Sequence, residues 1–345
     1  MNTLRTVRML RRRDQGEPAE QGPVKVSVVL PSFQHEEYVA EAVNSVLEQT
    51  HDNLELIVVD DASSDRTADV VAAIQDPRLR LVRLEQNRQA PARALGLGLA
   101  TGDLIAFQNS DDVWARTKLA QQIGQIQEQP GVAAVFTRVQ IIGADSQPAP
   151  DTWAAGSFRS SHSSSAAWLR FFFDIGNDLC ISSALCRRTD LERVGGFNPA
   201  LIQLSDLDLW VRLAALGQLR ILEEELTSMR VVEGRNLSAP STAVANRGSQ
   251  EHASVLERFS AAPVRQLLTE IFPEFAGQSG PGPVLLAQLA RYGFRHSGVA
   301  QQLFGLRLFE RVLAKPGGYE RIVAVMGSEI ISEYHERRGR LVVTI

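Results

Sequence analysis

The first third of the chain alternates between short, continuous apolar runs and longer stretches in which apolar residues recur every three or four positions. Uninterrupted apolar runs are typical of strands buried on both faces of a sheet, and they occupy residues 24–33, 54–65, 79–84 and 103–109. The recurring apolar positions predict amphipathic helices, which we expect within residues 36–50, 66–75, 90–100 and 118–127. This alternation predicts a doubly wound α/β sheet with helices on both faces.

Three of the predicted strands end in side chains that suit a ligand. Ligands of open α/β sheets bind beyond the carboxyl ends of the strands, so we expect these side chains to meet in space. They are Pro31, Ser32 and Phe33, then Asp60 and Asp61, and finally Asn109, Asp111 and Asp112. The last group has an alternative explanation, because Ser110 or Asp111 also suits the cap of the next helix. A helix cap does not explain why three strands end in this way.

A nucleotide is the natural ligand for such an edge of a sheet. One carboxylate accepts a hydrogen bond from a base or a ribose hydroxyl, and another holds a divalent cation that neutralises a diphosphate. A dinucleotide cofactor is the competing ligand, because residues 96–102, GLGLATG, mimic a glycine-rich fingerprint. The glycine spacing is one residue too long and the segment precedes a strand, which argues against NAD binding.

The segment 194–217 combines an apolar helical face with an acid at its start, Asp206. Two interpretations of this acid stay open. The dipole of the helix stabilises a carboxylate at this end, or Asp206 is a general base that takes a proton from an attacking hydroxyl. The apolar face consists of Leu204, Leu207, Trp210, Val211 and Ala214.

Two further regions differ from this α/β pattern. Residues 145–165 are polar and rich in serine, and they form either a loop that contacts an acceptor or an ordinary insertion. From residue 245 onward the pattern turns helical. No cluster of side chains suited to chemistry is visible there, so we expect a helical C-terminal region at 245–345.

Composition narrows the class of protein. The 345 residues are 44% hydrophobic with a net charge of −4, which suits a globular protein, and no basic excess points to nucleic acid. Cys180 and Cys186 have no second pair with which to form a zinc ribbon, and we expect both to be reduced. No apolar run reaches the roughly 18 residues of a membrane span, and no secretory signal is visible. We therefore expect a cytoplasmic protein.

Residues 1–23 form a basic stretch followed by a polar linker. The first 13 residues carry five arginines and no acid. We expect a disordered tail, because such a composition cannot bury enough apolar surface to fold. The alternative is a contact with anionic lipid headgroups, which places the protein peripherally at the inner face of the membrane.

Taken together and in this order, the motifs resemble those of the family 2 glycosyltransferases, whose catalytic domain has the GT-A fold. The resemblance covers about residues 24–240 and lies in four segments: VSVVLPSFQHEEYVAEAVNSVLEQT, LELIVVDDASSDRT, EQNRQAPARALGLGLATGDLIAFQNSDDVW and RRTDLERVGGFNPALIQLSDLDLW. It implies a mixed, nucleotide-binding sheet in a GT-A domain at residues 24–244.

The resemblance also implies an activity. It is the inverting transfer of a sugar from a nucleotide-sugar donor, with a UDP-sugar favoured, to a hydroxyl of a glycan or glycolipid, in polysaccharide or glycoconjugate assembly. Carried over by position, Pro31 and Phe33 line the base pocket, Asp61 accepts a hydrogen bond from the base, and Arg93 faces the nucleotide. A non-catalytic nucleotide-sugar-binding or assembly protein derived from this fold is the alternative.

The acids of the site follow from the same resemblance. Asp111 and Asp112 match the acids that bind the ribose and a metal–diphosphate, with Mg²⁺ or Mn²⁺ as the cation, and Asp206 matches the catalytic base. Three positions depart from the family pattern by lacking a carboxylate or a histidine, and we expect them to weaken the dependence on metal. They are Asn109, Ser205 and Val232.

Overall fold

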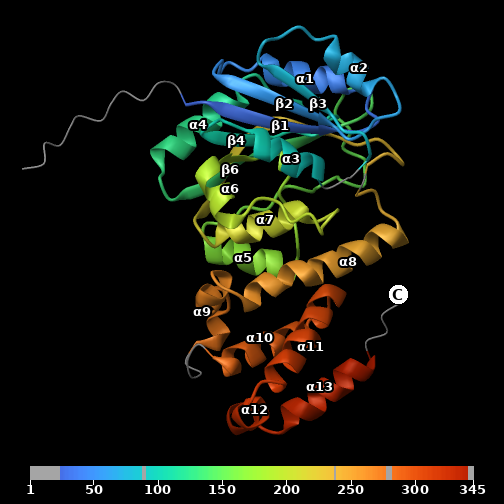
Figure 1. Cartoon of the computed structure of the whole chain (residues 1–345). Helices are drawn as coiled ribbons and strands as arrows, with labels where there is room; N and C mark the ends of the chain where they lie inside the picture. Colours follow the sequence, from blue (N-terminus) through green and yellow to red (C-terminus); the bar gives the residue numbers. More distant parts are fainter. Residues whose placement is uncertain (1–23, 88–90, 237, 277–281, 341–345) are drawn as a thin grey trace, which may run out of the picture.

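The computed structural model describes residues 24–87, 91–236, 238–276 and 282–340 (Figure 1). The predicted disordered tail at residues 1–23 lies outside the described residues. The predictions about residues 24–340 can be compared with the structure, except at residues 88–90, 237 and 277–281.

In the described ranges, the strands form one mixed sheet of eight strands in the order β3-β2-β1-β4-β7-β6-β8-β5. The first four neighbours are parallel, whereas β7 runs antiparallel to both β4 and β6, and β5 runs antiparallel to β8. The strands are β1 (Val26–Ser32), β2 (Leu54–Asp60), β3 (Leu79–Arg83), β4 (Leu104–Phe107), β5 (Val113–Trp114), β6 (Val132–Ile142), β7 (Leu185–Arg187) and β8 (Gln218–Arg230). The predicted α/β mixed sheet is therefore confirmed.

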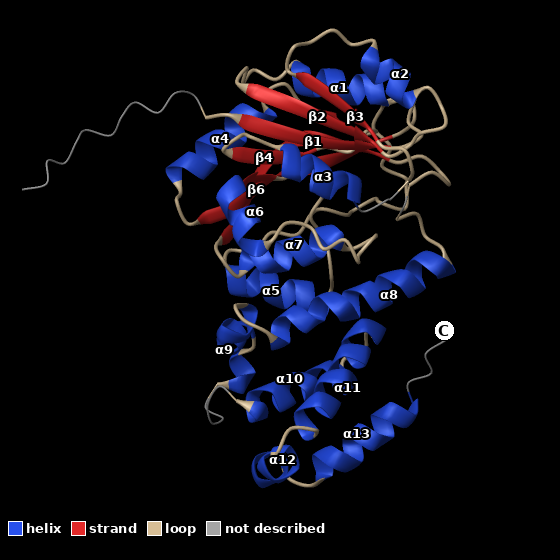
Figure 2. Cartoon of the chain, in the orientation of Figure 1, coloured by secondary structure: helices blue, strands red, loops and turns tan. Residues whose placement is uncertain are grey.

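Helices cover both faces of this sheet (Figure 2). Side chains alternate between the faces along β1, since Val28 packs into the core with α1 and α4, and Val29 packs into the core with α5 and α7. The helices of this part are α1 (Val39–Leu47), α2 (Thr67–Ala72), α3 (Pro91–Leu99), α4 (Lys118–Glu128), α5 (Ser165–Asp174), α6 (Arg188–Val194) and α7 (Ser205–Ala214). This burial on two sides explains why the strands read as continuous apolar runs.

The register of the sheet aligns the strand ends that the sequence singled out. Ser32 of β1 is paired with Asp60 of β2, and Val29 is paired with Phe107 at the end of β4. The residues after β1, β2 and β4 therefore emerge along one edge, as the parallel arrangement requires.

The C-terminal helices continue from the sheet without a separate core. The ring of Phe173 in α5 packs against the rings of Phe259, Phe272 and Phe304. The helices are α8 (Thr242–Leu256), α9 (Leu268–Ile271), α10 (Pro283–Arg295), α11 (Val299–Leu313), α12 (Gly318–Met326) and α13 (Glu329–Arg340), with short 3-10 turns at Ile181–Ser183, Glu257–Ser260, Val264–Leu267 and Pro273–Phe275. The predicted helical C-terminal region is present, and the division proposed at residue 244 falls inside α8.

Two expectations drawn from composition concern the whole chain. Cys180 and Cys186 are both free and buried. Within the ranges that the structure covers, no helix combines the length and the apolar composition needed to cross a bilayer.

Candidate active site

A cavity of about 470 Å³ lies at the carboxyl ends of β1, β2 and β4, and it reaches the start of α7. Six of the seven predicted site residues line it, although they come from five separate segments of the chain. They are Pro31, Phe33, Asp61, Arg93, Asp111 and Asp206. Trp153, from the predicted acceptor loop, lines it as well and is 40% exposed. The seventh predicted residue, Asp112, does not line the cavity.

The two acids after β2 have different surroundings. The carboxylate of Asp60 accepts hydrogen bonds from the Ser32 hydroxyl, at 3.2 Å, and from the Ser63 hydroxyl, at 2.6 Å. Asp60 therefore ties the loops after β1 and β2 to each other. Asp61 is anchored by its own backbone N–H, which donates to the Ser32 carbonyl at 2.8 Å, and it is the acid that lines the cavity.

The two acids after β4 also differ in their surroundings. Asp112 is 1% exposed, and its Oδ2 accepts hydrogen bonds from Ser182 Oγ at 2.5 Å and Asn109 Nδ2 at 3.0 Å. Its Oδ1 accepts from the Arg230 backbone N–H at 3.0 Å. Both oxygens are thus occupied inside the protein, which does not suit the predicted role as a metal ligand. Asp111 is the carboxylate that faces the cavity.

Arg230, at the end of β8, fixes the turn that carries these acids, and the sequence analysis missed it. Its guanidinium is fully buried and donates from Nε to the Asp111 carbonyl at 2.9 Å and from a terminal nitrogen to Glu41 Oε2 at 2.6 Å. Its other terminal nitrogen donates to the Gly143 carbonyl at 2.8 Å. Its partners Asp111 and Glu41 are more than a hundred positions away in the sequence. No local pattern around Arg230 predicts these contacts.

Burial raises the pKa of Asp111, while the positive charge of Arg230 opposes that shift. A carboxylate whose charged form lacks full compensation is a strong binder of a cation. His35 lies beside it: Nδ1 is 2.8 Å from the Ser110 hydroxyl, and Nε2 is 4.0 Å from Asp111 Oδ2. Burial lowers the pKa of His35, so its neutral form is favoured.

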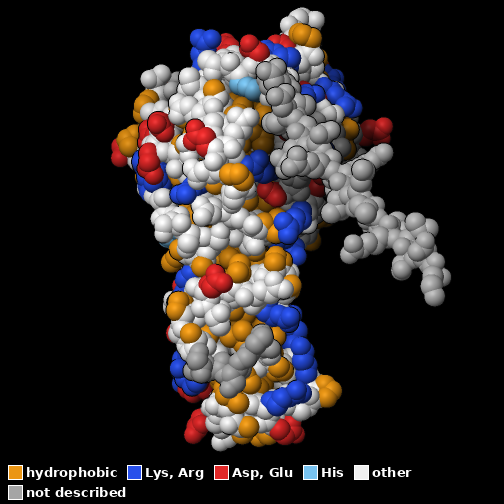
Figure 3. Space-filling view, turned by 90° about the vertical axis from the view of Figure 1, so that its left-hand side faces the viewer, with side chains coloured by type: hydrophobic (Ala, Val, Ile, Leu, Met, Phe, Trp, Pro, Cys, Tyr) orange, Lys and Arg blue, Asp and Glu red, His pale blue; other side chains and the backbone are white. Residues whose placement is uncertain are grey.

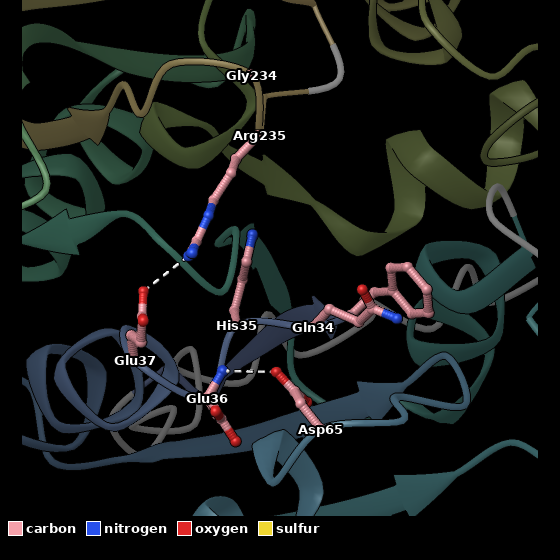
Figure 4. Close-up of a pocket in the computed structure, with 8 residues that line it drawn as sticks. Gln34, His35, Glu36, Glu37, Asp65, Gly234 and Arg235 are labelled. Carbon is pink, nitrogen blue, oxygen red and sulfur yellow. Dashed lines mark hydrogen bonds and ion pairs between the residues drawn. The ribbon is translucent and has the colours of Figure 1, made fainter.

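The loop after β8 closes over this side of the site. Arg235 donates to Glu37 Oε2 at 2.7 Å, and Figure 4 shows Arg235 and His35 extending into the same space. The space is a second cavity, of about 450 Å³. Its lining shares Phe33, His35 and Arg235 with the first cavity. The loop thus adds the positive charge of Arg235 to the lining of both cavities.

Asp206 stands at the first turn of α7, where the helix dipole favours a negative charge. Burial raises its pKa, whereas the charge of Arg93 and hydrogen bonds from Asn177 and the Leu207 backbone oppose that shift. The bond from Asn177 Nδ2 to Asp206 Oδ2 is 2.8 Å long. Asp206 lies in the first turn of α7 and also lines the cavity of the strand-end residues, so the helix-dipole interpretation and the general-base interpretation are compatible with each other.

Arg93 in α3 lines the cavity, close enough to Asp206 and Asp112 for the charges of both carboxylates to act on its guanidinium. One terminal nitrogen donates to Asn109 Oδ1 at 3.2 Å, and its Nε is buried without a partner. The position that departs from the family pattern, Asn109, therefore accepts a hydrogen bond from Arg93 but supplies no charge to neutralise it. Arg93 keeps donor capacity that a phosphate of a bound nucleotide can use.

Glu251 in α8 holds the segment that presents Asp206, and it too escaped the sequence analysis. Its carboxylate accepts hydrogen bonds from the backbone N–H groups of Ile202, Gln203 and Leu204, at 3.0, 2.8 and 2.8 Å. Three donors on one carboxylate fix the backbone before α7. A helix of the C-terminal region thereby positions the candidate base.

The donor set around Asp111 fits a hard divalent cation of the kind that Mg²⁺ exemplifies. In the part of the chain that the structure describes, no group of three or more His, Cys, Asp or Glu side chains forms a closed cage. Mg²⁺ is commonly held by one or two carboxylates together with substrate phosphates. A single carboxylate facing a nucleotide cavity is an arrangement of this open type.

Comparisons with known proteins agree with this fold. Residues 27–195 match the model of "Glycosyl transferase family 2". An uncharacterized glycosyltransferase of Nostoc sp. is 27% identical over 239 residues, which are 67% of this chain and 72% of that protein. The UDP-Glc:alpha-D-GlcNAc-diphosphoundecaprenol beta-1,3-glucosyltransferase WfgD of Escherichia coli is 37% identical over 122 residues, 35% of this chain and 48% of the relative. The chain thus spans about half the length of that relative.

A solved structure has a similar fold over most of the chain. It is the mannosyltransferase PcManGT from Pyrobaculum calidifontis in complex with GDP-Man and Mn²⁺, with a TM-score of 0.52 and 22% identity over 94% of this chain and 91% of that one. The fold is of the GT-A type that glycosyltransferases have. Within that class, the chain belongs to glycosyl transferase family 2.

Proposed function

We propose that the protein transfers a sugar, with inversion, from a nucleotide-sugar donor to a hydroxyl of a glycan or glycolipid. The observation that carries this proposal is the single cavity into which Asp61, Asp111 and Asp206 converge from three distant segments. Two acids suit the nucleotide and its diphosphate, and the third suits deprotonation of the acceptor. No nucleophile is required, because a base and an in-line displacement are sufficient for inversion.

Each residue has a defined part in this reaction. Phe33 and Pro31 border the base, and Asp61 accepts a hydrogen bond from it. Arg93 donates hydrogen bonds toward the phosphates. Asp206 takes the proton of the attacking hydroxyl while the bond from the sugar to the diphosphate breaks, and its raised pKa makes it a stronger base than an ordinary carboxylate.

Asp111 is the residue proposed to hold a divalent cation, with Mg²⁺ or Mn²⁺ as the candidates. When bound, such an ion neutralises the charge that develops on the leaving diphosphate. Arg235 and Arg93 add fixed positive charge around the same place. We expect the reaction to depend less on metal than it would with two free carboxylates. Asn109 has an amide where the family pattern has a carboxylate, and both oxygens of Asp112 accept hydrogen bonds from protein groups.

The setting of the reaction follows from weaker observations. The E. coli relative acts on a diphosphoundecaprenol-linked sugar, which supports a role in polysaccharide or glycoconjugate assembly with a UDP-sugar as donor. Figure 3 shows basic and hydrophobic side chains together on the C-terminal helices, and Tyr319 and Val325 of α12 are about half exposed. These features support a cytoplasmic protein that contacts the membrane surface.

Donor hydrolysis tests the proposal without knowledge of the acceptor. The purified protein is incubated with UDP-glucose, UDP-N-acetylglucosamine and GDP-mannose, with and without Mn²⁺, and released nucleoside diphosphate is measured. We expect release from one donor, with little release by Asp111→Asn or Asp206→Asn. A non-catalytic binding protein would instead bind a donor in calorimetry, equally well after Asp206→Asn, and release nothing in either form.

A further inference from the structure

A third cavity, an open groove of about 570 Å³, lies between the start of α7 and the C-terminal helices, and it adjoins the candidate active site. Its walls come from the turn after α5, the first three turns of α8 and the turn between α10 and α11. Gln203 lines both the groove and the donor cavity. Asn177, which donates to Asp206 Oδ2, lines the groove. The groove therefore begins at the candidate base.

The lining of this groove combines apolar side chains with polar ones and contains a single carboxylate. Its one carboxylate, Asp174, is engaged by Arg170 Nε at 2.6 Å and by the Tyr292 hydroxyl at 2.8 Å. No lysine or arginine is among the lining residues within the described chain. A ligand that carries phosphate or carboxylate groups would meet the Asp174 carboxylate and no lysine or arginine here, and burying such a charge unpaired is costly.

His252 presents a hydrogen-bond acceptor to the groove. Its Nε2 lies 2.9 Å from the Phe172 carbonyl, which can only accept, so Nε2 carries the proton. Burial lowers the pKa of His252, and the neutral ring then leaves Nδ1 as an acceptor. Gly176, at a φ of +118°, lies beside this edge of the ring, since a Cβ there would be in van der Waals contact with it, 3.7 Å from Cε1 and 4.0 Å from Nδ1.

Gln203 supplies the complementary donor at the junction. Its Oε1 accepts a hydrogen bond from Arg247 Nε at 3.1 Å, which orients the amide and leaves Nε2 as the donor. Apolar side chains such as Leu204 and Val244 line the space between these polar groups. Separate acceptors and donors on an apolar wall match a sugar ring, which has hydroxyls at its edge and C–H groups on its faces.

We propose that this groove binds the acceptor of the transfer reaction through its uncharged sugar units, with the attacking hydroxyl directed to Asp206. The proposal rests on the glycosyltransferase function proposed above. It assigns substrate recognition to α8 and the turn between α10 and α11, which lie outside the segment that matches the family model.

The test measures the binding of neutral methyl glycosides, mono- and disaccharides of glucose, galactose and N-acetylglucosamine, by saturation-transfer NMR on the full chain. Methyl glucuronide is the charged probe. Ala245→Trp fills the groove from α8, and Asn246→Trp, an exposed position that does not line it, is the matched control. His252→Gln keeps a donor for the Phe172 carbonyl and removes the Nδ1 acceptor.

We expect at least one neutral glycoside to bind the wild type and the Asn246→Trp variant equally. Its affinity should fall about tenfold or more in Ala245→Trp and severalfold in His252→Gln, with the glucuronide bound more weakly throughout. Equal affinity in Ala245→Trp and the control, a preference for the glucuronide, or no neutral glycoside bound would overturn the inference. Donor hydrolysis by the wild type decides the proposed function separately, so the two failures are distinguishable.

Discussion

Asn177 and Asp206, 29 positions apart in the sequence, are joined by a 2.8 Å hydrogen bond from an amide nitrogen to a carboxylate oxygen. The amide fixes the direction of the carboxylate and stabilises its charged form, while burial favours the neutral form. The balance between these two effects determines at which pH the candidate base is ionised.

Replacing Asp206 with asparagine should slow transfer strongly while leaving the donor site intact. General-base catalysis contributes on the order of 10²–10⁴-fold, so we expect a fall of that size in kcat and an unchanged donor Kd by calorimetry. An equal fall in donor affinity would show that Asp206 serves in nucleotide binding instead.

Replacing Asn177 with alanine should shift the pH dependence of the reaction. The lost hydrogen bond favoured the charged carboxylate, so the pKa of Asp206, already raised by burial, rises further. Because the base accepts a proton only when ionised, the acidic limb of the kcat/KM profile should move to higher pH. Asn246→Ala, at an exposed position on α8, should leave the profile unchanged, and an unchanged profile in both variants would exclude the coupling.

The stimulation of donor hydrolysis by Mn²⁺ should depend on the carboxylate of Asp111. It should not require a direct contact between the cation and Asp112. We expect Asp111→Asn to lose the stimulation of donor hydrolysis by Mn²⁺ with the folded state intact. In the wild type, burial raises the pKa of Asp111, so stimulation should vanish on acidification at a higher pH than the value near 4 that an ordinary carboxylate would give. Full stimulation retained by Asp111→Asn would assign the cation to another group.

Arg230→Met should destabilise the protein. It leaves buried carbonyl groups of Asp111 and Gly143 without donors, and each such group costs about 1–3 kcal/mol. We expect urea unfolding to show a loss of several kcal/mol. Arg235→Met, which removes an exposed partner of Glu37, should leave the unfolding midpoint where it was, and a similar loss in both variants would contradict this account.

Glu251→Gln should slow transfer without touching any substrate. The carboxylate of Glu251 accepts hydrogen bonds from three backbone N–H groups through its two oxygens. The amide of glutamine has only one acceptor oxygen, so the segment before α7 loosens. We expect faster hydrogen exchange at residues 202–204, a lower kcat, an unchanged donor KM and a loss of about 1–3 kcal/mol in stability. Glu257→Gln, which loses only a partly exposed pairing with Arg311, is the control.

Local sequence patterns were sufficient to predict the strands and the helix that carry the site residues. The apolar runs of β1, β2 and β4 and the helical spacing of α7 predicted these elements within a few residues, because burial on two faces or on one face leaves a period in the sequence. The parallel arrangement then predicted that the residues after the strands would converge, and Asp61 and Asp111 lie in one cavity.

The residues that the sequence did not disclose act through partners far along the chain. Asp112 and Asp111 are neighbours of the same type, and only the hydrogen bonds from Ser182, Asn109 and Arg230 make one structural and the other available. Likewise, nothing near Glu251 in the sequence indicates that its carboxylate holds the segment before Asp206. The family motifs stop before α8, so its part in the site depends on packing alone.

The sequence by itself determined the α/β class, the order of the elements and the convergence of three strand ends at one edge of the sheet. It could do so because hydrophobic periodicity and the residues at strand ends are local features of the sequence. The tertiary structure decided which acid faces the cavity, how Asp206 is held, and that the C-terminal helices form a groove beside it. Those outcomes depend on burial and on hydrogen bonds between segments up to a hundred or more residues apart, which no local pattern records.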